Sequence, residues 1–321
     1  MKCLQALRPR RAHAAWAIPF AALAILAFAV LSAVPQQQVS AEGVSPTAAV
    51  TTNALPEAAP VVASADMLGR SGRLRAVMGT PDALVEDPIL GPVLAGATSS
   101  ETGPWPRLAT ADGDSLTVVT LVPFGAAGTQ FEKYHVGRWP ADGMSASNPR
   151  YAPPKGFIGV TPENQETQVS ESFRMRDFLT HDQGNVWPKV LVLRPALLDK
   201  LELVRQELER EGLPSRLHVM SGFRTPQYNE QGVGKGGRAT HSRHMYGDAA
   251  DVFVDQDGNG QMDDLNHDGR ITVADARVLR AAAERVEAAY PELVGGLSAY
   301  PANSAHGPFV HVDARGVKAR W

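Results

Sequence analysis

Apolar residues recur with two different periods along the C-terminal half of the chain. A spacing of three and four positions predicts a helix that ends at Gly212 and has an apolar face of Leu197, Leu201, Val204 and Leu208. The same spacing predicts a second helix over residues 274–290. Short apolar runs predict strands at residues 190–193, 217–221, 250–254 and 308–313. Because these elements mix without a strict repeat, we expect an α+β domain with a mainly antiparallel sheet over residues 165–321.

Two of the predicted strands carry a polar residue on the face opposite their valines. Successive side chains of a strand point to opposite faces, so His311 points away from the valines on either side of it. By the same rule Asp251 points away from Ala250, Val252 and Val254. A buried strand has no packing reason to carry such a residue unless another group pairs with it. Both residues are therefore candidates for a functional site.

The N-terminal half is punctuated by Gly and Pro and is less regular. Its apolar runs predict strands at residues 116–122, 134–138 and 156–160, within a small β-rich accessory region over residues 65–160. Residues 42–64 are rich in Ala, Pro, Thr and Val, which is typical of an extended linker.

An uncharged apolar run over residues 14–34 follows the basic residues Lys2, Arg8, Arg10 and Arg11. Such a run is typical of a signal peptide or of an uncleaved anchor, and a span takes about 20 residues. Residues 39–41 offer a small-residue cleavage site, so residues 1–41 are predicted to be either one. The positive flank places the rest of the chain outside the cytoplasmic membrane, in the periplasm or on the outer face. If the segment is uncleaved, it also contacts the membrane.

Composition and charge exclude some classes of partner and of metal site. The formal net charge of −3 argues against a nucleic-acid partner, since such proteins are usually basic. Cys3 is the single cysteine, so an intrachain disulfide and a cysteine-based zinc site are both excluded. Nitrogen and oxygen must hold any metal.

Three residues have the spacing of a metal site. His244 and Asp251 lie seven positions apart around Gly247, and His311 lies on a later predicted strand. Convergence of two imidazoles and one carboxylate predicts a Zn²⁺ site with a coordination position left for water. The alternative is that His244 and Asp251 form only a hydrogen-bonded pair, with His311 satisfied separately.

Three segments in order carry a resemblance to a known family: residues 221–226 (SGFRTP), 242–251 (SRHMYGDAAD) and 309–313 (FVHVD). Together they resemble the zinc D-Ala-D-Ala carboxypeptidase and murein endopeptidase family, the bacterial branch of the Hedgehog-like peptidase fold. The resemblance covers about residues 170–321, and the ending with Gly316, Val317 and Trp321 is most similar to the exported murein endopeptidases.

The resemblance implies roles for particular residues. His244, Asp251 and His311 would be the zinc ligands, and Arg224 would steady the carbonyl or carboxylate of the substrate, a task suited to a planar guanidinium. Apart from the resemblance, Ser242 is expected to support the turn around His244 rather than attack the substrate, because zinc-bound water would be the nucleophile. Asp313 shares the strand face of His311 and is a weaker candidate for the base or an outer partner of the metal ligands.

The general base departs from the family pattern. Several relatives have an acidic residue three positions before the last zinc histidine, where this chain has Pro308. Some endopeptidase relatives instead use histidines just upstream. His306 is such a residue and is able to take a proton near neutral pH, so we predict that it is the base.

A second metal-binding pattern lies between the second and third predicted zinc ligands, in residues 255–275. Oxygen-bearing side chains at alternate positions, with glycines at the turns, are typical of EF-hand-type calcium loops, and the loop resembles the dockerin variety. The predicted calcium ligands are Asp255, Asp257, Asn259, Asp264, Asn266, Asp268 and Asp275. The alternative is an acidic turn that is merely solvated.

The sequence thus predicts a zinc-dependent peptidase that acts on peptidoglycan stem peptides or cross-links, with Zn²⁺ and Ca²⁺ as cofactors. The C-terminal resemblance favours an endopeptidase over a D-Ala-D-Ala carboxypeptidase. Because the acidic base is missing, a non-catalytic zinc- and calcium-stabilised module that binds cell-wall peptide or protein stays open. A peptidase for peptides from outside the wall stays open too.

Overall fold

A computed structural model describes residues 69–70, 75–86, 108–109, 115–234 and 237–321 of the chain. Helices and strands both occur in these ranges and most strand pairs are antiparallel, which confirms the predicted α+β class. Among the helices of the described part, none is long and apolar enough to cross a membrane. The predicted signal peptide or anchor and the predicted linker lie outside the described residues.

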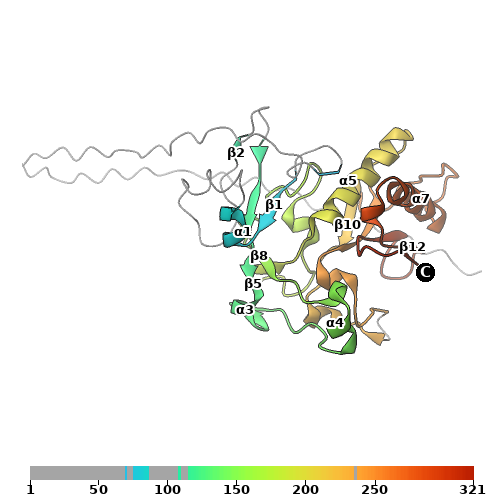
Figure 1. Cartoon of the computed structure of the whole chain (residues 1–321). Coiled ribbons are helices and arrows are strands. Elements are labelled where there is room, and N and C mark those ends of the chain that lie inside the picture. Colours follow the sequence, from blue (N-terminus) through green and yellow to red (C-terminus); the bar gives the residue numbers. More distant parts are fainter. Residues whose placement is uncertain (1–68, 71–74, 87–107, 110–114, 235–236) are drawn as a thin grey trace, which may run out of the picture. The chain divides into compact units, whose positions relative to one another are not determined.

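The largest sheet of the described residues has five strands in the C-terminal half (Figure 1). Its spatial order is β10 (Leu217–Ser221), β11 (Ala249–Val254), β13 (Phe309–Asp313), β12 (Gly296–Tyr300) and β14 (Ala319–Arg320). The first four strands pair antiparallel, and β14 adds a short parallel strand to β12.

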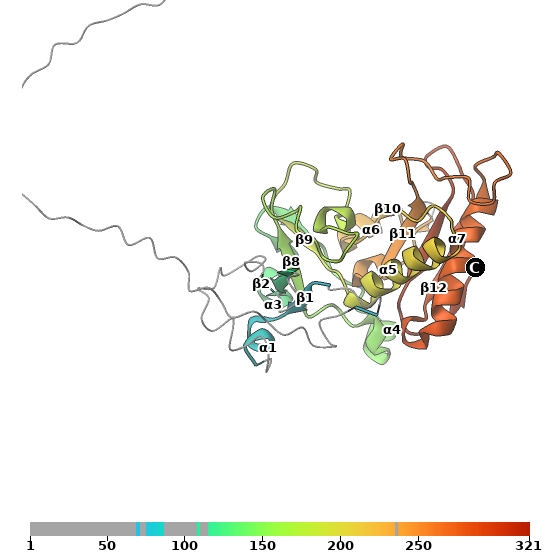
Figure 2. The same cartoon turned by 90° about the horizontal axis from the view of Figure 1, so that it is seen from above.

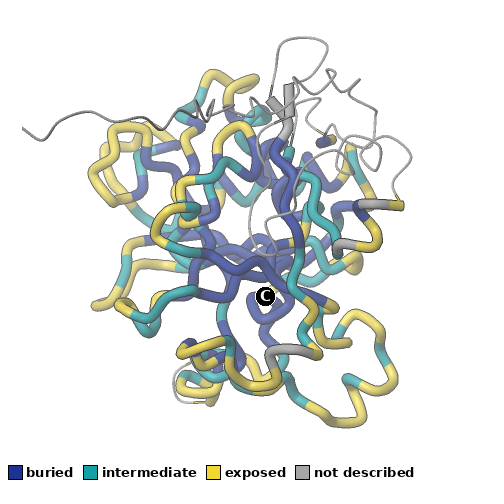
Figure 3. Tube along the Cα trace, turned by 90° about the vertical axis from the view of Figure 1, so that its left-hand side faces the viewer, coloured by how far each residue is buried: buried dark blue, intermediate teal, exposed yellow. Residues whose placement is uncertain are grey.

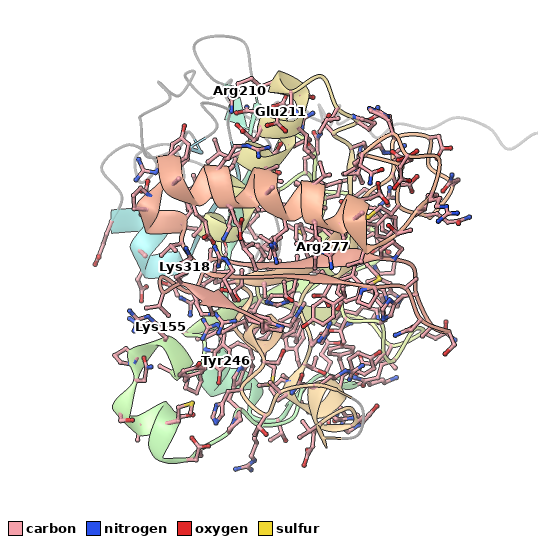
Figure 4. The ribbon with its side chains drawn as sticks, turned by 90° about the vertical axis from the view of Figure 1, so that its right-hand side faces the viewer. Lys155, Arg210, Glu211, Tyr246, Arg277 and Lys318 are labelled. Carbon is pink, nitrogen blue, oxygen red and sulfur yellow. The ribbon has the colours of Figure 1, made fainter. Side chains whose placement is uncertain are left out.

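Two long helices cover the apolar face of this sheet. α7 (Val273–Ala289) packs on β12 and β13, and α5 (Pro195–Arg210) packs against α7 (Figure 2). Figure 4 shows α7 along one side of the sheet, while the labelled Tyr246 lies on the other side. Val310 and Val312 of β13 and Val252 of β11 belong to the buried core. The alternation of each strand therefore turns Asp251 and His311 to the face opposite the helices.

Shorter elements frame the sheet in the same half of the chain. They are α6 (Pro226–Glu230) and the 3-10 turns η2 (Met175–Phe178), η4 (Arg243–Tyr246) and η5 (Pro291–Leu293).

The region before residue 160 is rich in short strands, as the sequence indicates. β5 (Val122–Pro123), β8 (Gly156–Val160) and β9 (Lys189–Leu191) form a three-stranded antiparallel sheet. Two-residue and three-residue strands make three small pairs: β1 (Val77–Gly79) with β4 (Val118–Thr120), β2 (Leu108–Ala109) with β3 (Ser115–Leu116), and β6 (Gln130–Phe131) with β7 (Tyr134–His135). The helical turns here are α1 (Pro81–Glu86), α3 (Phe124–Ala127), α4 (Gly143–Ser147) and η1 (Pro149–Tyr151).

One buried cluster contains apolar residues from both halves, including Phe157 of β8 and Leu201 of α5 (Figure 3). The domain boundary near residue 160 stays a prediction.

The elements differ from the sequence-based expectation in three places. Residues 116–122 are not one strand, because Leu116 belongs to β3, residues 118–120 form β4 and Val122 begins β5. These strands pair with β2, β1 and β8, so the chain passes through three sheets. The strand predicted at 134–138 ends at His135, before Gly137 adopts a positive φ of 81°. β12 is missing from the prediction, since Gly296 and Ala299 weaken its apolar pattern.

Candidate metal centre

His244, Asp251 and His311 converge on the polar face of the sheet. Asp251 Oδ1 lies 3.0 Å from His311 Nδ1 and 3.3 Å from His244 Nε2. The two ring nitrogens are 3.3 Å apart, and all three residues are buried. Within the described part of the chain, they make up the one group of three His, Cys, Asp or Glu residues whose ligand atoms all lie within 4.8 Å.

Strand register and a tight turn bring these residues together. Asp251 of β11 stands directly opposite His311 of β13, so the two are cross-strand neighbours. His244 lies in η4, which Gly247 ends with a left-handed conformation (φ 71°) before β11 begins. A Cβ at Gly247 would also lie 2.6 Å from the backbone of Val192, so only glycine fits this turn.

In each of the three residues, the nitrogen or oxygen atom that faces away from the centre makes a hydrogen bond to another part of the protein. His244 Nδ1 donates to the backbone carbonyl of Gly222 (2.7 Å), and His311 Nε2 donates to Asp313 Oδ2 (3.1 Å). Asp251 Oδ2 accepts from the guanidinium of Arg224. Such outer partners fix the tautomer and the orientation of metal-binding side chains.

These hydrogen bonds decide which atoms carry protons. A carbonyl only accepts, so His244 Nδ1 carries a hydrogen and its neutral ring presents a lone pair at Nε2. In the same way the bond to Asp313 leaves a lone pair at His311 Nδ1 when that ring is neutral. Two nitrogen lone pairs and a carboxylate oxygen then face one another with no donor between them. Such a cluster is stable only with a cation or an added proton at its centre, and a nitrogen and oxygen donor set of this kind fits Zn²⁺.

Electrostatics keep two of the groups in the metal-binding form. Burial lowers the pKa of His244, which favours its neutral ring. Burial alone would raise the pKa of Asp251, but interactions with His244 and His311 in their protonated forms hold that pKa well below its usual range. Burial also works to lower the pKa of His311, yet hydrogen bonds to Asp251 and Asp313 outweigh it and raise the pKa. His311 is therefore the group at which a proton competes with a metal ion.

Asp313 is buried beneath His311, as an outer partner should be. Its carboxylate also accepts hydrogen bonds from the amide of Gly296 (2.8 Å) and from the guanidinium of Arg315 (2.9 Å from Nε). Burial works to raise the pKa of Asp313, but His311 and Arg315 lower it strongly, so the carboxylate stays charged. Arg315 is a residue that sequence reasoning missed. Its position two residues after Asp313, on the same face of the strand end, is the signal that could have revealed it.

Arg224 lies at the edge of the centre. Its Nε donates to Ser221 Oγ (2.9 Å), while its Nη2 donates to Asp251 Oδ2. Both Arg224 and the three metal-site residues line a cleft of about 830 Å³. The structure thus brings Arg224 to the place that a substrate-orienting residue needs.

His306 lines the same cleft but does not touch the three central residues. It lies in the loop before β13, and its Nδ1 donates to the carbonyl of Gly307 (2.8 Å). Its Nε2 lies 2.8 Å from Asn303 Nδ2, which donates to it. Both ring nitrogens of His306 are therefore hydrogen-bonded by its own loop. Its assignment as the base stays a prediction.

Ser242 occupies the N-cap position of η4 and is buried, although its hydroxyl makes no capping hydrogen bond. Its backbone carbonyl accepts from the amide of Met245 (3.1 Å), so it supports the turn around His244 through the main chain.

The predicted calcium residues lie in a loop stabilised by its own backbone. Asp255 accepts hydrogen bonds from the amides four and five residues later, and Asp264 repeats this pattern. Asp275 is buried at the start of α7 and accepts from three amides, which makes it a helix-capping residue. The other predicted ligands, Asp257, Asn259, Asn266 and Asp268, are exposed. Calcium binding stays a prediction.

The β-rich region contacts the turn that carries His244, which local sequence patterns do not indicate. Trp139 donates from Nε1 to the carbonyl of Met245 (2.9 Å), and Arg243 donates to the carbonyl of Arg150 (2.6 Å). Tyr151 lines the cleft and stacks edge-on with Tyr246. The segment around residues 139–151 therefore braces η4, the turn that carries His244.

Comparison with known proteins supports a peptidase. A family model described as Peptidase M15 matches residues 172–271. The match includes His244 and Asp251 and ends before His311, which the fold adds to them. It supports the M15 zinc peptidase family and, with the His–Asp–His cluster, a zinc metallopeptidase. No curated protein and no solved structure matches the chain.

Proposed function

We propose that this chain is a zinc peptidase that hydrolyses peptidoglycan stem peptides or their cross-links. The observation that carries the proposal is the convergence of His244 Nε2, Asp251 Oδ1 and His311 Nδ1, because two nitrogen donors and one carboxylate oxygen at this distance match the ligand set of a catalytic zinc ion. A zinc ion bound there supplies Lewis-acid activation of water and of a peptide carbonyl.

The residues around the centre supply orientation and proton transfer. Arg224 is held by Ser221 and Asp251, and its remaining N–H donors are suited to orienting a carbonyl or carboxylate of the substrate. His306, which also lines the cleft, is the side chain that we propose as the proton carrier. Asp313 stays ionised and holds the His311 ring in one orientation.

The cleft itself suits a peptide. Its volume of about 830 Å³ lies in the upper part of the range of about 300–1,000 Å³ for ligand sites. Tyr300, Phe309 and Trp321 line one part of it, and the rings of Tyr300 and Phe309 stack 4.7 Å apart. Aromatic side chains provide apolar contact area for a peptide chain, and the donors of Arg224 line the same cleft. The C-terminal resemblance favours cleavage of cross-links over removal of terminal D-Ala.

Export and calcium complete the proposal. The basic flank and apolar run of residues 1–41 support export, with the enzyme acting in the periplasm or on the outer face of the cytoplasmic membrane. Calcium in residues 255–275 would have a structural role, and a weak site would fill at the millimolar calcium found outside cells.

The decisive experiment is mass spectrometry of purified peptidoglycan digested by the full chain, with chelator and after zinc is restored. We expect new monomeric stem peptides only when zinc is present, which identifies an endopeptidase and its bond. Loss of terminal D-Ala alone would identify a carboxypeptidase. Cleavage of ordinary peptides without D-residues would redirect the proposal to other substrates. No cleavage despite one bound zinc per chain would favour a non-catalytic binding module.

A further inference from the structure

A second cavity adjoins the metal cleft and takes no part in the proposed chemistry. Its volume is about 350 Å³, within the range of sites for small ligands. Met220 and His306 line both this cavity and the metal cleft, so the two spaces share a wall. A chain that occupies the cleft is therefore within reach of this cavity.

The walls come from four parts of the fold, one of which is the loop after η2 that contributes His181. Met220 of β10 and Phe253 of β11 belong to the sheet, and residues 305–308 belong to the loop before β13. The third wall is the loop between β11 and α7, which contributes Met262 and Ile271. Ile271 is 46% exposed, although most large apolar residues of the described part are buried. An apolar side chain left at a cavity rim is available for contact with a ligand.

The cavity lining is apolar with neutral hydrogen-bonding groups. No Asp, Glu, Lys or Arg is among its lining residues in the described part of the chain. His218 packs its ring on Phe253 at 4.7 Å, and burial, aided by the charge of Arg224, lowers the pKa of His181. Both imidazoles therefore lack a carboxylate partner in this lining, and His181 favours its neutral form. Such a wall does not compensate for the desolvation of a lysine ammonium.

We propose that this cavity receives an uncharged apolar side chain of the peptide substrate, next to the bond at the metal centre. Ile271 and Met262 then determine specificity, which gives the loop of residues 255–275 a role in choosing the substrate. The inference rests on the proposed peptidase function, because the metal centre is what anchors the peptide beside the cavity.

Three small hydroxamates test it, since a hydroxamate binds zinc and places its own side chain beside the metal. The probes are the hydroxamates of N-acetylleucine, N-acetyllysine and N-acetylglycine, and calorimetry gives their Kd for the zinc-loaded full chain. We expect the leucine compound to bind at least about tenfold more tightly than the glycine compound, from burial of its four carbons. The lysine compound should gain no more than about twofold over glycine, because its ammonium must be desolvated.

Ile271→Ser should reduce the preference for leucine over glycine by at least about threefold. The matched control is Val317→Ser, since Val317 is similarly exposed (42%) and lines neither space. Circular dichroism confirms that both variants are folded. Equal affinity of the wild type for leucine and glycine compounds, or an unchanged preference in Ile271→Ser, would overturn the inference and leave the metal centre intact. Failure of all three compounds to bind would count against the metal centre itself and remove the basis of the inference.

Discussion

Two regions of this chain carry oxygen and nitrogen ligands at metal-like spacing, and they are built in opposite ways. The His244–Asp251–His311 centre takes residues from a turn and two strands, buries them and holds their outer atoms, so lone pairs face inward. The loop of residues 255–275 has more carboxylates, but they are neighbours in sequence, and Asp255, Asp264 and Asp275 already accept bonds from loop amides. The difference shows that convergence of lone pairs, and not the number of carboxylates, creates the need for a metal.

The strongest test of this difference removes one ligand from each region. His311→Ala should lower peptide hydrolysis by at least about 10³-fold and abolish zinc binding, because it removes a donor from the buried centre. Asp268→Ala, in the exposed loop, should keep one zinc per chain and activity within about twofold. Metal analysis by mass spectrometry and steady-state kinetics measure both. Similar losses of zinc and activity in the two variants would contradict the proposed difference between the buried centre and the loop.

A smaller effect is expected at the rim of the cleft. His306→Ala should lower kcat by about 10²-fold with zinc affinity unchanged, since proton transfer by a positioned side chain contributes about 10²–10⁴-fold. A normal kcat in this variant would show that another group moves the proton.

The outer partner of His311 sharpens the comparison further. Asp313→Asn should weaken zinc affinity by about 10–100-fold, because the amide no longer holds the ring as a carboxylate does. Asp248→Asn is the matched control, since Asp248 is equally buried and pairs with Arg243 rather than with a metal-site residue. Competition with a chelator gives the affinities, and thermal unfolding separates them from general loss of stability. Equal zinc affinities in the two variants would contradict the role of Asp313.

The stability of the metal-free protein should depend on pH, and the directions of the pKa shifts determine the sign of this dependence. The pKa of His311 is raised on folding, so its contribution to stability is fully present below about pH 6.5 and is lost as pH rises through the folded value. The pKa of Asp251 is lowered, so its contribution is present above about pH 3.8 and is lost as pH falls through the folded value. We expect the Tm of the metal-free protein to fall as pH rises from 6 to 9, on the order of a few degrees. His311→Gln should remove this fall, and the zinc-loaded protein should not show it.

The smallest expected effect concerns the loop. If calcium binds there, millimolar calcium should raise Tm by about 2–4 °C in the zinc-loaded protein. Asp264→Ala should abolish the rise without changing zinc content. A calorimetric scan with no calcium-dependent change would identify residues 255–275 as a solvated acidic turn.

Local patterns predict much of the fold but miss parts of it for physical reasons. β8 and β10 have the predicted bounds. α5 ends two residues before the predicted end, and α7 begins and ends one residue before its predicted bounds. The sequence does not predict β12, because its small residues leave no periodic apolar pattern. In the structure, residues 297–300 of β12 nevertheless pair with β13. The strand expected over residues 116–122 divides among three sheets, and nothing in an apolar run reveals where a strand changes partner.

The candidate site divides in the same way. Asp251 and His311 were accessible from the sequence because each stands out against an apolar strand pattern. His244 was accessible from its spacing to Asp251, and Arg224 from the family resemblance. The Gly222 carbonyl that holds His244 was not accessible, since every residue has a carbonyl. The contact of Trp139 with Met245 joins residues more than a hundred positions apart, and local spacing carries no information on such a contact.

The sequence by itself determined the class of the fold, the main helices and strands, and the identity of the residues that face away from the core. These features follow from the period of the backbone, which acts over a few residues. Only the tertiary structure decided which lone pairs meet, which outer atoms hold them, how residues 139–151 brace the turn of His244, and where the second cavity opens. Those features depend on strand register and on packing between distant segments, and the chain has them only once it is folded.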